Sequence, residues 1–406
     1  MYLVLPRRER EKADSFSFLF PESHHSPGNR GQGFPSIFFF SGLLSSFSFP
    51  SVSSFVLLFD RHSSSMGDVR IDDLPRRLSS EDARILLEST DVFIFDCDGV
   101  IWKGDMLIEG VAQTMEMLRS MGKKLVFVTN NSRKSRRQYA KKFERVGLTV
   151  NEEEIFSSSF AASVFLESIN FPKERKVYII GEEGICEELE LIGLTCLGGP
   201  EDGKKRIDFK PDLFIEHDKS VGAVVVGLDQ YINYYKIHYA TLCIRGNPGC
   251  LFIATNQDAS GHMTDSQEWP GAGSMVGAIR GSTQKEPIVV GKPSQLMMKL
   301  LLERFQTDAS KMCMVGDRLD TDILFGLNGG CKTLLVLSGE ETAFSTPLHP
   351  IWSGCVTTLA GLTDPSNNIH PDYYTEKPYT GIVGAIDIPL EMTDLDSWER
   401  ALALNP

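Results

Sequence analysis

Residues 92–105, with the sequence VFIFDCDGVIWKGD, constrain the fold of this 406-residue chain more than any other stretch. The first four are all apolar, which is the pattern of a strand buried on both faces of a parallel sheet. The strand then ends on Asp96, and Asp98 and Gly99 follow, so a sharp turn is expected at the carboxyl edge of the sheet, where open α/β folds bind ligands. One interpretation is a nucleophilic carboxylate with a second carboxyl as acid/base beside a metal. The other is a solvated acidic turn, and this motif alone does not decide between them.

The charge and the cysteines exclude several classes of protein. The formal net charge of -13 argues against nucleic-acid binding, which requires a clustered basic face. A small anionic substrate would therefore need a local positive site within an acidic protein. The eight cysteines are scattered, without a Cys-x-x-Cys pair, and several lie in apolar runs. This pattern predicts reduced cysteines and favours a reducing compartment.

The first 65 residues differ from the rest of the chain. They are rich in serine, and no charged residue occurs from Phe34 to Phe59. The serines and prolines of this run make it a poor helix in lipid, so we expect no membrane span. We interpret residues 1–80 as a leader that is disordered or removed. A serine-rich leader also fits a plastid transit peptide, but acidic residues near the start oppose that reading, and we favour the cytoplasm with the plastid stroma as the alternative.

From residue 81 onward, strand and helix patterns alternate. A second buried strand, KLVFVTNN (124–131), lies between predicted helices over 107–121 and 133–147. Further strands are predicted at 176–181, 222–229, 250–256, 287–293, 312–318 and 332–339. Alternation of this kind predicts an α/β fold with a doubly wound parallel sheet. For the basic residues Arg133, Lys134, Arg136 and Arg137, a solvated face is favoured over a phosphate site.

Three other predicted strands also end in polar residues. Thr129 closes the second strand and offers a hydroxyl to an anion at a helix N-terminus. Lys292 follows PIVVG, and Asp317 and Asp322 follow MCMVG, where hard oxygen ligands suit Mg²⁺. Each of these features alone is better explained as a polar loop or a cap. Together the four strand ends, Asp-x-Asp, Thr-Asn-Asn, Gly-Lys-Pro and Gly-Asp-x-x-x-x-Asp, resemble the four motifs of the haloacid dehalogenase superfamily.

The resemblance covers about residues 80–340 and implies a role for each motif residue. Asp96 would attack phosphorus, and Asp98 would protonate the leaving oxygen and then deprotonate water. Residues of the second and third motifs, Thr129, Asn130, Asn131 and Lys292, would bind substrate. Mg²⁺ would be held by Asp96, the backbone of Asp98 and Asp317, with Asp322 orienting these ligands. A cation and an ammonium are chemically required, because the nucleophile and the phosphate are both negative.

The spacing of the motifs predicts the position of a second domain. The connection between Asp98 and the first helix is too short for a domain, whereas Thr129 and Lys292 are far apart in the sequence. We therefore expect a core of residues 81–171 and 287–375, an inserted α/β cap domain of residues 172–286, and an irregular tail of residues 376–406. The branch of the superfamily with this arrangement contains pyridoxal, nitrophenyl and phosphoglycolate phosphatases, and the resemblance suggests a possible homodimer through the cap.

The same resemblance implies a substrate class, with alternatives left open. The wording of the motifs is most similar to plant phosphoglycolate phosphatases, which implies a small phosphorylated acid as substrate and a cap histidine, His262, in contact with it. A satisfied loop histidine is the other reading of His262. Another phosphoester, transfer of the phosphoryl group to a sugar, and a non-catalytic binding module are the other possible functions. The last is disfavoured because both Asp96 and Asp98 are present.

Overall fold

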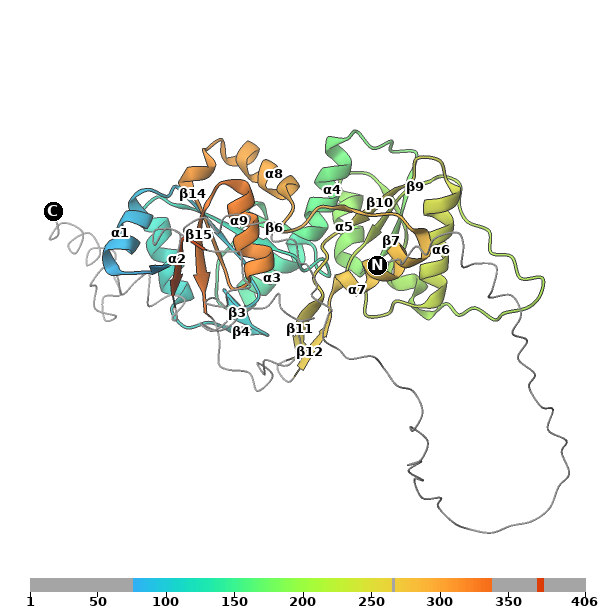
Figure 1. Ribbon diagram of the computed structural model, residues 1–406, viewed down its shortest axis with the longest axis horizontal. Helices are drawn as coiled ribbons and strands as arrows, with labels where there is room; N and C mark the ends of the chain where they lie inside the picture. Colours follow the sequence, from blue (N-terminus) through green and yellow to red (C-terminus); the bar gives the residue numbers. More distant parts are fainter. Residues whose placement is uncertain (1–75, 265–266, 338–370, 376–406) are drawn as a thin grey trace, which may run out of the picture. The chain divides into compact units, whose positions relative to one another are not determined.

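The computed structural model describes residues 76–264, 267–337 and 371–375 (Figure 1). The expected leader up to residue 75 and the expected tail at 376–406 lie outside the described residues. The described part has the predicted α/β architecture, with two parallel sheets and helices between the strands. No described helix is long and apolar enough to cross a membrane.

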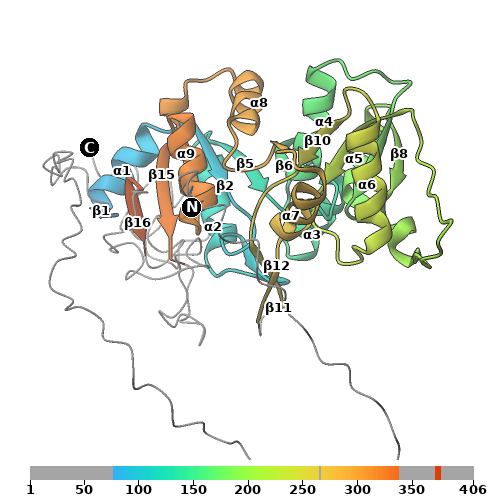
Figure 2. The same cartoon turned by 45° about the vertical axis from the view of Figure 1, so that its right-hand side comes forward.

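The first sheet has seven strands, all parallel, in the order β1-β16-β15-β14-β2-β5-β6 (Figure 2). Its central strand is β14, and the next strand, β2, pairs with β14 on one side and β5 on the other. The strands are β1 (Arg76–Arg77), β2 (Val92–Phe95), β5 (Lys124–Thr129), β6 (Ile155–Ser157), β14 (Met312–Gly316), β15 (Lys332–Val336) and β16 (Tyr373–Thr375). Because β2, β5 and β14 are adjacent and parallel, the residues that follow them meet at one edge of the sheet.

The second sheet has five parallel strands in the order β13-β10-β9-β7-β8. Its strands are β7 (Lys176–Ile180), β8 (Thr195–Gly198), β9 (Val221–Val226), β10 (Leu251–Ala254) and β13 (Ile288–Val289). Two short antiparallel hairpins complete the strands: β3 (Trp102–Lys103) with β4 (Met106–Leu107), and β11 (Ser260–Thr264) with β12 (Gln267–Pro270).

Nine α-helices are described, and most begin with a side-chain cap. They are α1 (Ser80–Glu88), α2 (Val111–Ser120), α3 (Arg136–Arg145), α4 (Ser158–Ser168), α5 (Glu183–Leu191), α6 (Tyr234–Gly246), α7 (Ala272–Thr283), α8 (Gln295–Phe305) and α9 (Leu324–Gly329). Helix α3 shows how the sequence sets such a boundary. The Ser135 hydroxyl accepts the Gln138 backbone N–H and the Gln138 side chain returns a bond to Ser135, which satisfies two donors that the helix leaves open.

Strand β2 is buried on both faces, as its unbroken apolar sequence predicts. Phe93 and Phe95 pack in a cluster with residues of α1, α2 and α3, whereas Val92 and Ile94 point into a second cluster. Successive side chains of a strand face opposite sides of the sheet, so each face of β2 has its own apolar core.

The second of these clusters is shared between the two sheets. It contains Val92 and Ile94 of the first sheet, Val177 and Ile179 of the second, and residues of α4, α5 and α8. The opposite face of the second sheet forms a third cluster, with Tyr178 and residues of α6 and α7.

Several details differ from the expectation. The first sheet includes β1, so structured residues begin inside the range assigned to the leader. β13 pairs with β10, so Ile288 and Val289, expected in the core, belong to the second sheet. His262 lies on strand β11 and not in a loop. The seven described cysteines are free thiols, as predicted.

Candidate active site

The turn after β2 places two aspartates at the edge of the first sheet, and its shape depends on glycine. Asp96 is buried, with 7% of its surface exposed, and its backbone N–H donates to Val315. Gly99 adopts a φ of 87°, and a Cβ at this position would lie 2.1 Å from Asp317 Oδ2. Only glycine allows both this backbone conformation and this close approach. The turn therefore brings the Asp96 loop against the Asp317 loop.

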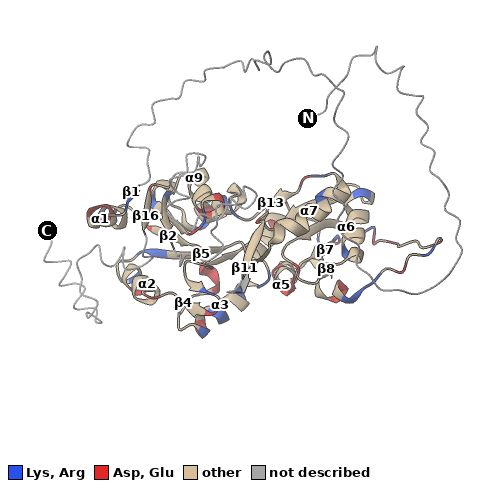
Figure 3. Cartoon of the chain, turned by 60° about the horizontal axis from the view of Figure 1, so that its bottom comes forward, with Lys and Arg blue, Asp and Glu red and all other residues tan. Residues whose placement is uncertain are grey.

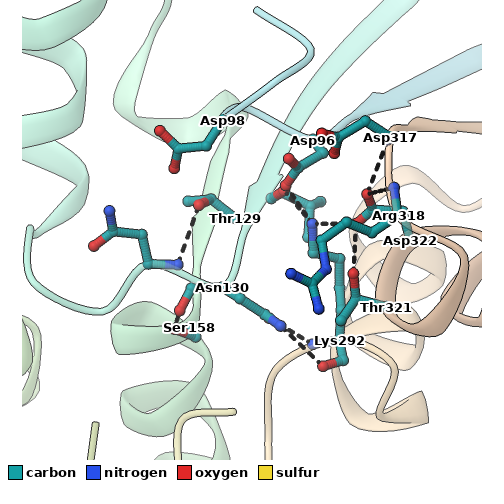
Figure 4. Close-up of polar contacts among 12 residues, drawn as sticks. Asp96, Asp98, Thr129, Asn130, Ser158, Lys292, Asp317, Arg318, Thr321 and Asp322 are labelled. Carbon is teal, nitrogen blue, oxygen red and sulfur yellow. Dashed lines mark hydrogen bonds and ion pairs between the residues drawn. The ribbon is translucent and has the colours of Figure 1, made fainter. Parts of the chain in front are cut away.

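Lys292 brings a positive charge to the aspartates at this edge of the first sheet (Figure 4). It is 2% exposed, and its Nζ donates to Asp96 Oδ1, to Asp322 Oδ1 at 2.7 Å and to the Val128 carbonyl at 3.0 Å. The two carboxylates raise the pKa of Lys292 against the opposing effect of burial, so its ammonium stays charged. Burial raises the pKa of Asp96, and the nearby Lys292 opposes this rise. Lys292 thus balances part of the negative charge of Asp96 and Asp322.

The remaining negative charge fits a divalent cation. Carboxylate oxygens of Asp96, Asp317 and Asp322 lie within 4.8 Å of one another, and all three residues are buried. Burial, followed by the charge of Asp322, raises the pKa of Asp317 to about 7. Three carboxylates with one ammonium leave an excess of negative charge, and oxygen ligands at this spacing suit Mg²⁺. The residues present therefore fit the metal that the sequence implies.

Asp322 is hydrogen-bonded both to Lys292 and to the loop that carries Asp317. Its Oδ1 accepts from Lys292, and its Oδ2 accepts the backbone N–H groups of Asp317, at 3.2 Å, and Arg318, at 3.1 Å. A Cβ at position 316 would lie 2.2 Å from the Asp322 Cβ, so Gly316 makes this contact possible. Asp322 therefore fixes both the lysine and the loop that carries Asp317.

Asp98 is placed differently from the other acids. Its side chain is 46% exposed, and its Oδ1 accepts the indole N–H of Trp102 at 2.8 Å. In Figure 4 its carboxylate points away from Asp96 and Asp317. The structure therefore brings Asp98 to the same turn as Asp96 but not into the carboxylate group.

Two residues of the second motif shape the turn after β5. Thr129 is 2% exposed, and its Oγ1 accepts the backbone N–H of Asn131 at 3.1 Å. The Asn131 Oδ1 in turn accepts the backbone N–H of Arg133 at 3.1 Å. In the view of Figure 4, Thr129 lies between Asp98 and Asp96.

Asn130, which the sequence predicts to bind substrate, is hydrogen-bonded to protein groups on both sides of its amide. Its Oδ1 accepts the Lys292 backbone N–H at 2.9 Å, and its Nδ2 donates to the Lys292 carbonyl at 3.0 Å. The same Nδ2 donates to both carboxylate oxygens of Asp258, at 3.0 and 3.2 Å. Asn130 therefore links the strand end of the first sheet to Lys292 and to the loop after β10.

Sequence reasoning missed Asp258. Burial raises its pKa to about 6, with Arg318 and Lys292 opposing the rise. The only sequence signal was its place in ATNQD, directly after the buried strand β10, which is the same strand-end pattern that identified the core motifs.

Arg133 and Arg136 do not belong to a solvated face, which corrects the expectation for these two residues, whereas Arg137 is exposed as expected. Arg133 pairs with Glu182 at 2.8 Å, and Arg136 pairs with Glu188 at 2.9 Å, where Glu188 is only 1% exposed. The Arg136 backbone N–H also donates to Glu188 at 2.6 Å. The contrast between basic α3 and acidic α5 is visible in Figure 3. Arg133 and Arg136 therefore link α3, beside the first sheet, to α5, beside the second sheet, and do not bind phosphate.

His262 is placed only by its backbone, on β11, and its side chain is outside what the structure describes. The polar sequence of β11 has no clear alternation, which is why the sequence predicted a loop.

Comparisons with known proteins agree with this site. A family model described as haloacid dehalogenase-like hydrolase matches residues 93–195, and one described as HAD-hydrolase-like matches residues 289–352. The chain is 63% identical over 306 residues to phosphoglycolate phosphatase 1A, chloroplastic, of Arabidopsis thaliana, covering 75% of this chain and 80% of that protein.

Two solved structures resemble the fold. The p-nitrophenyl phosphatase from Archaeoglobus fulgidus has a TM-score of 0.59 and 30% identity, over 73% of this chain and 99% of that one. The glycerol phosphate phosphatase of Mycobacterium tuberculosis in complex with magnesium has a TM-score of 0.56 and 27% identity, over 73% and 77% of the two chains. The four strand-end motifs and these matches together show that the chain belongs to the haloacid dehalogenase-like hydrolases.

Proposed function

We propose that this protein hydrolyses phosphomonoesters through an aspartyl-phosphate intermediate, with 2-phosphoglycolate as the preferred substrate and glycolate and phosphate as products. The observation that carries the proposal is the buried Asp96 carboxylate in contact with Lys292 and grouped with Asp317. A nucleophile, an ammonium and a cation site in one buried group are what phosphoryl transfer to a carboxylate requires.

The residues of the chain divide the reaction into two steps. In the first, an Asp96 oxygen bonds to phosphorus while the ester P–O bond breaks, and Asp98 gives its proton to the leaving alcohol. In the second, Asp98 takes a proton from water as the water oxygen bonds to phosphorus, and the bond to Asp96 breaks to release phosphate. Lys292 offsets charge on the phosphoryl oxygens, and Thr129 offers them a hydroxyl.

Mg²⁺ fits the group formed by Asp96 and Asp317, with Asp322 orienting both the loop and the lysine. When bound, the metal would supply charge neutralisation between the anionic nucleophile and the anionic phosphate. The comparison with a relative in complex with magnesium supports this choice of metal.

The choice of substrate rests on the relatives and on the chemistry of the second sheet's loops. Because the core motifs recognise only a phosphoryl group, discrimination between esters must come from the inserted domain. An imidazole at His262 can carry a positive charge near neutral pH and would suit the carboxylate of 2-phosphoglycolate. The 63% identity to a phosphoglycolate phosphatase supports this ester over the nitrophenyl and glycerol phosphates named for the solved relatives.

The decisive experiment is a comparison of kcat/KM over a panel of phosphomonoesters with Mg²⁺, using 2-phosphoglycolate, nitrophenyl phosphate, pyridoxal phosphate, glycerol phosphate and a sugar phosphate. The expected result is the highest value for 2-phosphoglycolate, with free phosphate released without any acceptor. A preference for another ester would overturn the substrate, and phosphoryl transfer to a sugar without release of phosphate would overturn hydrolysis.

The comparisons favour the plastid over the cytoplasm that the sequence favoured. The Arabidopsis relative is named as chloroplastic, and residues 1–65 are rich in serine, as transit peptides are. We therefore propose the plastid stroma, and a fluorescent fusion of residues 1–65 that stays in the cytoplasm would contradict this. A homodimer through the inserted domain stays a prediction, for which sedimentation of the full chain is the test.

A further inference from the structure

Arg318 directly follows Asp317 in the sequence, and the proposed mechanism does not use its side chain. Only 16% of this side chain is exposed, and its Nε and Nη2 donate to Asp320 Oδ1 and Oδ2 at 3.2 and 2.9 Å. Its backbone N–H donates to Asp322 at 3.1 Å. A guanidinium that binds a carboxylate through two parallel hydrogen bonds is fixed in its plane. The loop after β14 therefore holds a cation in a defined orientation beside the aspartates of the site.

The positive charge of Arg318 also faces the loop after β10. Burial raises the pKa of Asp258 in that loop, and the charge that opposes this rise most is that of Arg318, ahead of Lys292. In the view of Figure 4, the guanidinium extends from the Asp317 loop toward the side chain of Asn130, which donates to Asp258. Arg318 therefore lies between the edge of the first sheet that carries Asp317 and a loop of the second sheet.

A phosphomonoester whose phosphoryl group lies at Asp96 has the rest of its molecule outside the buried aspartates. Lys292 donates to Asp96, Asp322 and the Val128 carbonyl, and in the proposed mechanism it serves the phosphoryl oxygens. The Arg318 side chain is longer and less buried than that of Lys292, with 16% exposed against 2%. Arg318 is therefore better placed than Lys292 to meet a charged group on the outer part of a substrate.

We propose that Arg318 binds the carboxylate of a phosphorylated 2-hydroxy acid and is a specificity-determining residue. This inference rests on the proposed function. In 2-phosphoglycolate a single methylene separates the ester oxygen from the carboxylate, so the carboxylate must lie close to the residues that flank the phosphoryl site. A guanidinium can match a carboxylate through two parallel N–H bonds, which a lysine ammonium cannot do. The role of Arg318 adds to that proposed for His262, because a carboxylate accepts several hydrogen bonds.

The test compares 2-phosphoglycolate with ethyl phosphate, a two-carbon ester without the carboxylate. In Arg318→Met, the ratio of kcat/KM for 2-phosphoglycolate to kcat/KM for ethyl phosphate should fall about thirtyfold, as expected for loss of a charge-assisted hydrogen bond. Both esters use the same nucleophile and the same metal site, so damage to the phosphoryl site or a loss of folded protein cancels in this ratio. Arg318→Lys keeps the charge but not the forked geometry, and its ratio should lie between those of the wild type and Arg318→Met.

Two further variants test whether the effect belongs to this position. Arg304, on α8, pairs with Glu153 at 2.7 Å and is the matched control, so Arg304→Met should leave the ratio unchanged. Lys142 is a rival cation, because its ammonium lies 3.8 Å from Asp98 Oδ1 and 4.2 Å from the centre of the Trp102 ring. Lys142→Met should change the ratio by less than about twofold if Arg318 binds the carboxylate.

The outcomes separate the inference from the proposed function. A ratio in Arg318→Met within about twofold of the wild type would overturn the inference, and so would a fall of the ratio in Lys142→Met that exceeds the fall in Arg318→Met. A wild-type protein that hydrolyses neither ester, or that favours ethyl phosphate, would instead contradict the proposed function.

Discussion

Asn130 and Asp258 are 128 residues apart in the sequence, yet the amide nitrogen of one lies 3.0 and 3.2 Å from the two carboxylate oxygens of the other. The same amide group of Asn130 holds the backbone of Lys292 on both sides. The loop after β10 is therefore coupled to Lys292 through a single side chain. A substitution in this loop should therefore affect the site around Lys292 even when the substituted residue does not contact substrate.

The raised pKa of Asp258 predicts a pH dependence of stability. Because burial raises its pKa to about 6 in the folded protein, the carboxyl stabilises the fold most below about pH 4, and this contribution is lost as the pH rises through 6. Relative to Asp258→Asn, the wild-type free energy of unfolding should therefore fall by about 1–2 kcal/mol between pH 4 and pH 7. Urea unfolding at several pH values measures this difference. The exposed Asp105→Asn is the matched control, and a parallel pH profile for wild type and Asp258→Asn would contradict the prediction.

Replacing the nucleophile should abolish turnover without unfolding the protein. Asp96→Asn is nearly isosteric but cannot form the acyl phosphate, so kcat should fall by more than about a thousandfold. Steady-state hydrolysis of 2-phosphoglycolate and thermal melting of the same sample test both parts. Residual activity within about tenfold of the wild type, with deamidation excluded by mass spectrometry, would rule out Asp96 as the nucleophile.

Removal of the metal should destabilise the protein through the carboxylate group. At saturating Mg²⁺, about 100 times the dissociation constant, linkage gives about 2.7 kcal/mol of stabilisation, so the melting temperature should rise by several degrees over the value in a chelator. Asp317→Asn should remove most of this response. It should also melt above the wild type in the chelator, because it removes one of three buried like charges. The same Mg²⁺ response in both proteins would show that Asp317 is not a ligand.

Replacing His262 should reduce kcat/KM more for one substrate than for another. His262→Ala should reduce kcat/KM for 2-phosphoglycolate by about 1–3 kcal/mol of transition-state binding, the range for a charge-assisted hydrogen bond to its carboxylate. Nitrophenyl phosphate has no such carboxylate and should be less affected. His238, on α6, provides a matched histidine control. Equal losses on both esters would mean that His262 acts on the phosphoryl group or on the loop.

The core motifs could be predicted because each of them lies in a short continuous stretch of sequence, in which an apolar strand is followed by a polar residue. Val92–Phe95 is apolar throughout, and a carboxylate at the end of such a strand has few structural reasons to be there. The same logic placed Thr129, Lys292 and Asp317 at strand ends, where the structure has them. Parallel pairing of β2, β5 and β14 then brings Asp96, Thr129 and Asp317 together, whereas Lys292 follows a strand of the second sheet and its approach to Asp96 could not be predicted in this way.

The features that were missed depend on contacts between distant segments. Lys142 reads as one more charge on a basic helix until Trp102 and Asp98 are seen beside it. Ile288 and Val289 look like a core strand, and only their pairing with Ile253 and Ala254 assigns them to the second sheet. Burial patterns identify strands, but they do not name a strand's partner.

The apolar cluster that Val92 and Ile94 share with Val177 and Ile179 bears on how the chain unfolds. Helix α4, which belongs to this cluster, packs on α5, so neither sheet can lose its partner without exposing apolar side chains to water. Two domains with separate cores would melt in two steps, each with its own enthalpy. Because the two sheets share this cluster, we expect them to unfold as one cooperative unit, and calorimetry should record a single transition.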